Sequence, residues 1–143
     1  MKLQRSSRLA LYSVLELASR PEEQLSASDI AAKFNVSLNH LAKVLRDLGR
    51  ASLVEAVRGA GGGYRFCGNA RRTTLKDVVE IFEPISLHDA GAYEPGDTTE
   101  FGTALAVVLG EIDDIALATL DSITLETMLK LTHRVQKQTT KFA

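Results

Sequence analysis

The stretch VSLNHLAKVLRDLGRASLVEAVRGAGGGYRF, residues 36–66, joins a predicted helix to a predicted hairpin. Ser37 is placed to cap the helix, and Gly49 or the residues just after it end it. SLVEAV (52–57) and YRFCG (64–68) predict two short strands, joined by the turn RGAGGG (58–63). The leucines and the valine of the helix recur at helical spacing and predict its buried side: Leu38, Leu41, Val44, Leu45 and Leu48.

The glycines of residues 58–63 have two possible uses, a loop around a nucleotide phosphate or the tip of a hairpin. A dinucleotide-binding fingerprint needs a glycine where Tyr64 stands and a helix after it, and a P-loop needs Gly-Lys-Ser or Gly-Lys-Thr. The sequence meets neither requirement, so the hairpin is favoured. A nucleotide-binding enzyme that uses this loop is the rival hypothesis, although no nucleophile, base and orienting residue lie together in the sequence.

Two further helices are predicted on the amino-terminal side. Residues 5–19 carry apolar residues at helical spacing, and Arg20-Pro21 ends the pattern. LSASDIAAKF, residues 25–34, reads as a short helix with Ser26 and Asp29 as a capping box. This short helix and the next one form a helix-turn-helix, and the hairpin adds a wing to it.

The carboxyl-terminal half predicts a short helix, a loop and a long helix. LKDVVEIFEP (75–84) reads as a helix ended by Pro84, and the polar loop 85–99 follows. The long helix begins from Asp97, with Glu100 as a capping box, and ITLETMLKL (123–131) gives a last short helix before a tail that frays. A seam spaced four, three, four and three along the long helix predicts a homodimer: Phe101, Leu105, Val108, Ile112 and Ile115.

Charge divides the chain into two parts. Residues 1–76 carry 13 Lys or Arg and 6 Asp or Glu, a net charge of +7, whereas residues 77–143 carry 4 and 12, a net charge of −8. A basic half suggests a polyanionic partner, because each cation near a phosphate releases counterions. We therefore expect a winged helix-turn-helix DNA-binding domain at 1–76, and a sensory loop with dimerisation helices at 77–143. The apolar runs are too short to span a membrane, which predicts a cytoplasmic protein without a membrane partner.

The candidate contacts with double-stranded DNA lie on the third helix and on the wing. The early turns of a recognition helix reach base edges in the major groove, and wing arginines suit a narrow minor groove. A solvated helix face and surface arginines are the plain alternatives. On the helix the candidates are Ser37, Asn39, His40, Lys43 and Arg46, and on the wing Arg58, Gly61, Gly62 and Arg65.

The chain resembles the Rrf2 family of bacterial transcription regulators, the IscR, NsrR and CymR type. The resemblance covers nearly the whole length and rests on VSLNHLAKVLRDLGRASLV, VRGAGGGYRF, DVVEIFEPISL and ITLETML. It implies a mainly α fold with a small β-hairpin wing, that is, a winged helix-turn-helix plus a long dimerisation helix. It also implies a transcription regulator, which we expect to be a repressor. The two-fold symmetry of the predicted homodimer places the two third helices about one turn of DNA apart, which predicts a palindromic operator. A small-ligand or redox-sensing protein is an alternative function.

The resemblance fails at the ligands of the family's iron–sulfur cluster. Sensing members carry three cysteines in the loop that corresponds to HDAGAYEPGDTTEFG (88–102), where this chain has none, and part of the family has an acidic ligand where Arg8 stands. We therefore expect no cofactor. His88 and Asp89 are only weak metal candidates, and the effector is unknown.

The single cysteine, Cys67, has two possible roles. An exposed thiol of low pKa senses oxidants, whereas a lone cysteine in a strand is more often a small buried apolar residue. The sequence favours the buried, structural role.

Overall fold

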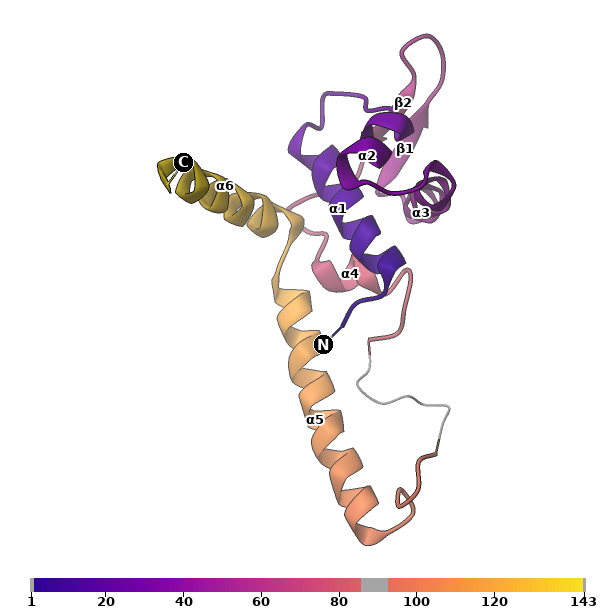
Figure 1. Ribbon diagram of the computed structural model, residues 1–143, viewed down its shortest axis with the longest axis vertical. Coiled ribbons are helices and arrows are strands. Elements are labelled where there is room, and N and C mark those ends of the chain that lie inside the picture. The colour runs from indigo at the N-terminus through magenta and orange to yellow at the C-terminus, as the bar shows by residue number, and fades with distance from the viewer. Residues whose placement is uncertain (1, 86–92, 143) are drawn as a thin grey trace.

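The computed structural model describes residues 2–85 and 93–142. Helices α1 to α4 and the hairpin gather into one body, and α5 projects from it as a long rod (Figure 1). The carboxyl end of α5 lies beside the body, and α6 turns away from α5 at that end. The fold is mainly α with a hairpin wing, as the sequence predicts. The elements are α1 Arg5–Ser19, α2 Ala27–Phe34, α3 Leu38–Arg50, β1 Val54–Val57, β2 Gly63–Phe66, α4 Leu75–Val79, α5 Glu100–Ser122 and α6 Leu125–Phe142.

Two serine caps set the helix-turn-helix. The Ser26 hydroxyl accepts a hydrogen bond from the Asp29 amide at 3.1 Å and starts α2, and the Ser37 hydroxyl accepts one from the His40 amide at 3.1 Å and starts α3. Asn35 ends α2 in the left-handed conformation, with φ of 53°, which asparagine tolerates better than most residues. The turn between the helices is therefore encoded locally.

The core lies where α1 crosses α3 and α4. Leu17, Leu41, Leu45 and Leu48 are fully buried in it. Leu38 does not join them, because its side chain is 50 % exposed, so the prediction that it points inward is wrong. Helical side chains tilt toward the helix amino terminus, so the side chain of the first residue of α3 points beyond the end of the packed face.

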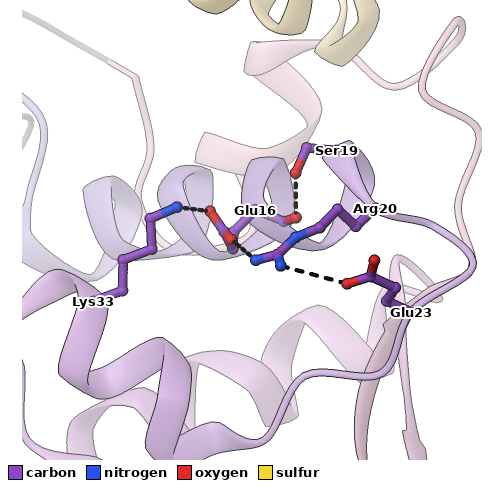
Figure 2. A network of polar contacts seen from close by, with 5 residues as sticks. All are labelled: Glu16, Ser19, Arg20, Glu23 and Lys33. Carbon is purple, nitrogen blue, oxygen red and sulfur yellow. Dashed lines mark hydrogen bonds and ion pairs between the residues drawn. The ribbon is translucent and has the colours of Figure 1, made fainter.

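An ion-pair network ties α2 to α1 (Figure 2). The Glu16 carboxylate on α1 pairs with the Lys33 ammonium on α2 and with the Arg20 guanidinium, which also reaches Glu23 at 3.4 Å. Burial by itself would raise the pKa of the Glu16 carboxyl, but hydrogen bonds from Lys33 and Arg20, together with their charges, lower it below its ordinary value of 4.5. The network holds the helix-turn-helix against the rest of the body.

The wing is an antiparallel hairpin in which Val54 faces Phe66 and Val57 faces Gly63. It is shorter than predicted, since the paired strands exclude Ser52 and Cys67. Tyr64 also pairs with the chain between α1 and α2, through two backbone hydrogen bonds with Leu25. The second strand of the wing, β2, is thus attached to the segment between α1 and α2.

The joint between α4 and α6 connects the two halves of the chain. The Leu75 amide donates to the Ile123 carbonyl at 2.9 Å, and the Leu125 amide donates to the Thr73 carbonyl at 2.9 Å. The predicted helix over 75–84 is wrong in length, because α4 ends at Val79. The next amides, of Ile81 and Phe82, bond to carbonyls three residues back, which tightens the chain into turns.

Both ends of the carboxyl-terminal half differ from the prediction. Thr99, not Asp97, caps α5: its hydroxyl accepts from the Gly102 amide at 3.1 Å. The Asp97 carboxylate instead accepts from the Glu94 amide at 2.7 Å in the preceding turn. The tail does not fray, because α6 runs unbroken to Phe142. Residues 132–142 contain neither glycine nor proline, and polarity alone does not end a helix.

Candidate nucleic-acid interface

One side of α3 is open and carries polar and basic side chains. Asn39, Lys43 and Arg46 are exposed, and their spacing of four and three residues puts them on one face of the helix. Ser37 is exposed at the start, although its hydroxyl caps the helix, and His40 is partly exposed. The structure thus puts Asn39, Lys43 and Arg46 on one exposed face of α3, with Ser37 and His40 near its amino-terminal end.

Arg50 extends the same face and was missed by the sequence interpretation. It follows Arg46 by four residues, is exposed, and contacts Asp47 only at 3.7 Å. The continued spacing of four and three could have identified it.

The wing tip has an unusual backbone that glycine permits. Gly59 and Gly61 have φ of 110° and 76°, conformations that residues with a Cβ adopt at a cost. Arg58 at the tip is exposed and forms no ion pair with any residue that the structure describes. The tip links two antiparallel strands and does not lead into a helix amino terminus, so it lacks the geometry of a phosphate-binding loop.

Arg65 lies further from the tip than the sequence suggested. It sits opposite Glu55 across the hairpin, and its Nε donates to the Glu55 carboxylate at 3.0 Å. The pairing compensates the charge of Arg65 and lays its side chain along the sheet. Arg58 and the predicted Gly61 and Gly62 therefore form the tip, while Arg65 lies on its side.

Cys67 is exposed, and the prediction of a small buried residue is wrong. It lies just past the end of β2, where its Sγ donates to the Ser52 carbonyl at 3.4 Å. Partial burial of the thiol raises its pKa above the ordinary 9.0, the nearby Glu55 carboxylate raises it further, and Arg65 opposes both. A raised pKa leaves little thiolate at neutral pH, which argues against a reactive thiol.

The metal-ligating side chains of this chain do not fit the iron–sulfur cluster that the resemblance attributes to the family's sensing members. The chain has one cysteine, and the described residues contain no group of three His, Cys, Asp or Glu side chains that could hold a metal ion. His88 and Asp89 lie outside the described residues. Across the described ranges, no helix is both long and apolar enough to cross a bilayer.

The α5 helix exposes the predicted seam. Monomeric soluble proteins rarely expose so many large apolar side chains along one helix, so the exposed seam suggests an interaction surface. The exposed fractions are 78 % for Phe101, 56 % for Leu105, 51 % for Val108, 43 % for Ile112 and 67 % for Ile115.

Known proteins share this arrangement. The model of the Rrf2 family, described as iron-dependent transcriptional regulator, matches residues 3–131. A Rhodopseudomonas palustris protein named as an HTH-type transcriptional regulator, BadM, is 49 % identical over 141 residues, which are 97 % of this chain and 88 % of BadM.

Two solved structures are similar along nearly their whole length. IscR of T. potens has a TM-score of 0.76 at 26 % identity, over 95 % of this chain and 91 % of IscR. CymR, the global cysteine regulator of B. subtilis, has a TM-score of 0.73 at 29 % identity, over 92 % of this chain and 98 % of CymR. The chain belongs to the Rrf2 family of transcriptional regulators.

Proposed function

We propose that the protein is a homodimeric repressor that binds a palindromic site in double-stranded DNA with α3 and the wing. The observation that carries this proposal is that α3 and the wing both expose cations without an ion-pair partner among the described residues. Lys43 and Arg46 on α3 and Arg58 on the wing are exposed, and none forms an ion pair with a residue in the described ranges. Cations without partners on adjacent elements suit a phosphate backbone.

In this proposal, α3 reads the major groove. Asn39 lies in its first turn, where side chains reach base edges, and an asparagine side chain can make two hydrogen bonds to adenine. Lys43 lies one turn further on and can meet a guanine or a phosphate. Arg58 at the wing tip is expected to contact the minor groove or its phosphates.

A second copy of the chain is the expected cover for α5. The exposed seam from Phe101 to Ile115 is apolar, and burying it against its symmetry mate removes it from water. A two-fold axis places the two α3 helices on successive major grooves, about one helical turn of DNA apart. That arrangement requires a palindromic operator.

Regulation is proposed to proceed without an iron–sulfur cluster. Even two chains together supply only two Cys67 thiols, and Cys67 follows β2 in the sequence, outside the stretch 88–102 that corresponds to the cysteine-bearing loop of sensing members. We expect protein purified without oxygen to be colourless and free of stoichiometric iron. A visible charge-transfer band accompanied by iron would contradict this part of the proposal.

The proposal as a whole is tested on DNA from upstream of the protein's own gene. Wild-type protein should retard this fragment and protect a symmetric site. Asn39→Ala should lose about ten-fold or more in affinity for that site, since a bidentate base contact contributes about 1–3 kcal/mol. Lys137→Gln, which changes an exposed lysine on α6, is the matched control. Tight nucleotide binding without retardation would favour the rival enzyme hypothesis.

A further inference from the structure

A groove of about 470 Å³ lies between the first half of α1 and the turn that joins α2 to α3. Its apolar wall is formed by Leu9, Tyr12, Phe34 and Val36. The rings of Tyr12 and Phe34 are stacked, with centroids 5.6 Å apart and planes at 29°. Tyr12 is nevertheless 45 % exposed, so an aromatic surface stays open to the groove. The volume falls in the range of small-molecule sites.

Two arginines stand at the rim of this apolar groove. Arg5 and Arg8 are three residues apart on α1 and share a face of the helix. Both are exposed, and neither is ion-paired with any residue between 2 and 85 or between 93 and 142. A guanidinium binds a carboxylate through two parallel hydrogen bonds. The rim therefore offers an anion site next to an apolar wall.

The groove also opens onto the helix proposed to read DNA. Ser37 and His40, the cap and the third residue of α3, belong to its lining. Anything bound against Tyr12 and Phe34 would lie beside the first turn of α3. Occupancy and DNA binding would then share residues.

We propose that this groove binds a small organic acid with a flat apolar body and one carboxylate, and that the bound acid weakens DNA binding. The acid places its carboxylate on Arg5 and Arg8 and its body on the aromatic wall. A DNA phosphate could meet the same arginines, but a phosphodiester chain would leave the apolar wall uncovered. The effect on DNA rests on the proposed function, whereas the binding of the acid does not.

Binding is tested with a matched pair of probes on the full-length protein. Titration calorimetry with 2-naphthoate and the neutral 2-naphthamide compares the same flat body with and without charge. We expect saturable binding of the acid, and binding of the amide at least about ten-fold weaker, a difference of about 1.4 kcal/mol. The double change of Arg5→Gln and Arg8→Gln should reduce acid binding about ten-fold. Arg72→Gln, an exposed arginine outside the groove, should leave it unchanged.

Equal affinity for acid and amide, no binding of either, or binding that survives the double change would overturn the site. Circular dichroism of the variants checks that the exposed substitutions leave the fold intact.

The coupling is measured separately by retardation of the upstream DNA fragment with and without saturating 2-naphthoate. We expect the acid to weaken DNA binding at least about five-fold for wild type and for Arg72→Gln. If the acid binds but leaves DNA affinity unchanged, the proposed coupling is overturned. If the Arg5 and Arg8 changes abolish DNA binding while no acid binds to wild type, the arginines are phosphate contacts and the whole proposal is overturned. If the acid binds but no DNA is retarded, the site stands and the proposed function fails.

Discussion

Leu25 and Tyr64 are paired by two backbone hydrogen bonds, with the Leu25 amide 2.9 Å from the Tyr64 carbonyl and the Tyr64 amide 2.8 Å from the Leu25 carbonyl. Through this pair, the segment before α2 is bridged to β2, in addition to the pairing of β2 with β1. The wing is therefore fixed relative to the helix-turn-helix. Its tip and α3 can then approach one DNA duplex as a single surface.

Replacement of Gly63 by alanine should disturb this pairing. A Cβ on Gly63 would lie 2.4 Å from the Leu25 carbonyl oxygen and 2.7 Å from its carbon, both backbone atoms that cannot rotate away. We expect Gly63→Ala to lower the free energy of unfolding by about 1–3 kcal/mol and to weaken DNA binding. Urea unfolding and DNA retardation measure the two effects.

Gly49→Ala is the matched control for this experiment. Its Cβ would lie 3.7 Å from the Val54 carbonyl, which is ordinary contact. Its unfolding free energy should stay within about 1 kcal/mol of wild type. A Gly63→Ala protein as stable as the control would show that the wing is not held against Leu25.

The Glu16 network should make stability depend on pH. The pKa of Glu16 is lower in the folded protein than its ordinary value of 4.5, so the stabilisation is present above that value and is lost as pH falls through the folded pKa. Glu16→Gln should cost about 1 kcal/mol at pH 7, a modest figure because Lys33 and Arg20 are half-exposed. Urea unfolding should show the cost shrinking below pH 4.5. Glu23→Gln, which changes a more exposed carboxylate, is the control and should change the free energy of unfolding little at any pH. A cost in stability for Glu16→Gln that grows as the pH falls would contradict the account.

The α5 seam should control the oligomeric state. Leu105→Asp places a carboxylate in the proposed interface, where an unpaired charge is costly. Light scattering at micromolar concentration should give a dimer mass for wild type and a monomer mass for the variant, and the variant should also lose DNA affinity. Thr103→Asp lies on the side of α5 away from Leu105 and should remain dimeric. A monomeric wild-type protein would remove the basis for a palindromic site.

Cys67 should react slowly despite its exposure. Because its pKa is raised above 9.0, thiolate is scarce at neutral pH, so alkylation by iodoacetamide should be slow at pH 7, rise about ten-fold per pH unit, and level off only above pH 9.0. Mass spectrometry of timed samples from pH 7 to about pH 10 gives the rate profile. Alkylation that is already complete within seconds at pH 7 would support an oxidant-sensing role instead.

The helix-turn-helix could be predicted from the sequence because its signals are local. Ser26 and Ser37 lie next to the helices they cap, and the glycines of the tip lie within the hairpin they form. The length of α6 is harder to predict, because its polar carboxyl-terminal half lacks an apolar pattern; the helix continues because residues 132–142 contain no glycine or proline to end it.

Contacts between segments that are distant in the sequence could not be predicted, because no local sequence pattern marks them. The Leu25–Tyr64 pairing joins backbone groups 39 residues apart and requires no particular side chain at Leu25. The groove combines residues from α1 with residues around Val36, and neither set is distinctive alone. Such features depend on the assembled fold rather than on a short pattern.

The salt dependence of binding to the upstream DNA fragment tests the central claim most directly. If Lys43, Arg46 and Arg58 contact phosphates, the logarithm of the binding constant should fall steeply and linearly with the logarithm of salt concentration, and affinity should drop at least about a hundred-fold between about 50 and 200 mM salt. Lys43→Gln removes one phosphate contact from each protomer of the dimer and should therefore reduce the slope by about two, whereas Lys137→Gln should not change it. Binding that is insensitive to salt, or a slope that Lys43→Gln leaves unchanged, would contradict a DNA interface built on α3 and the wing.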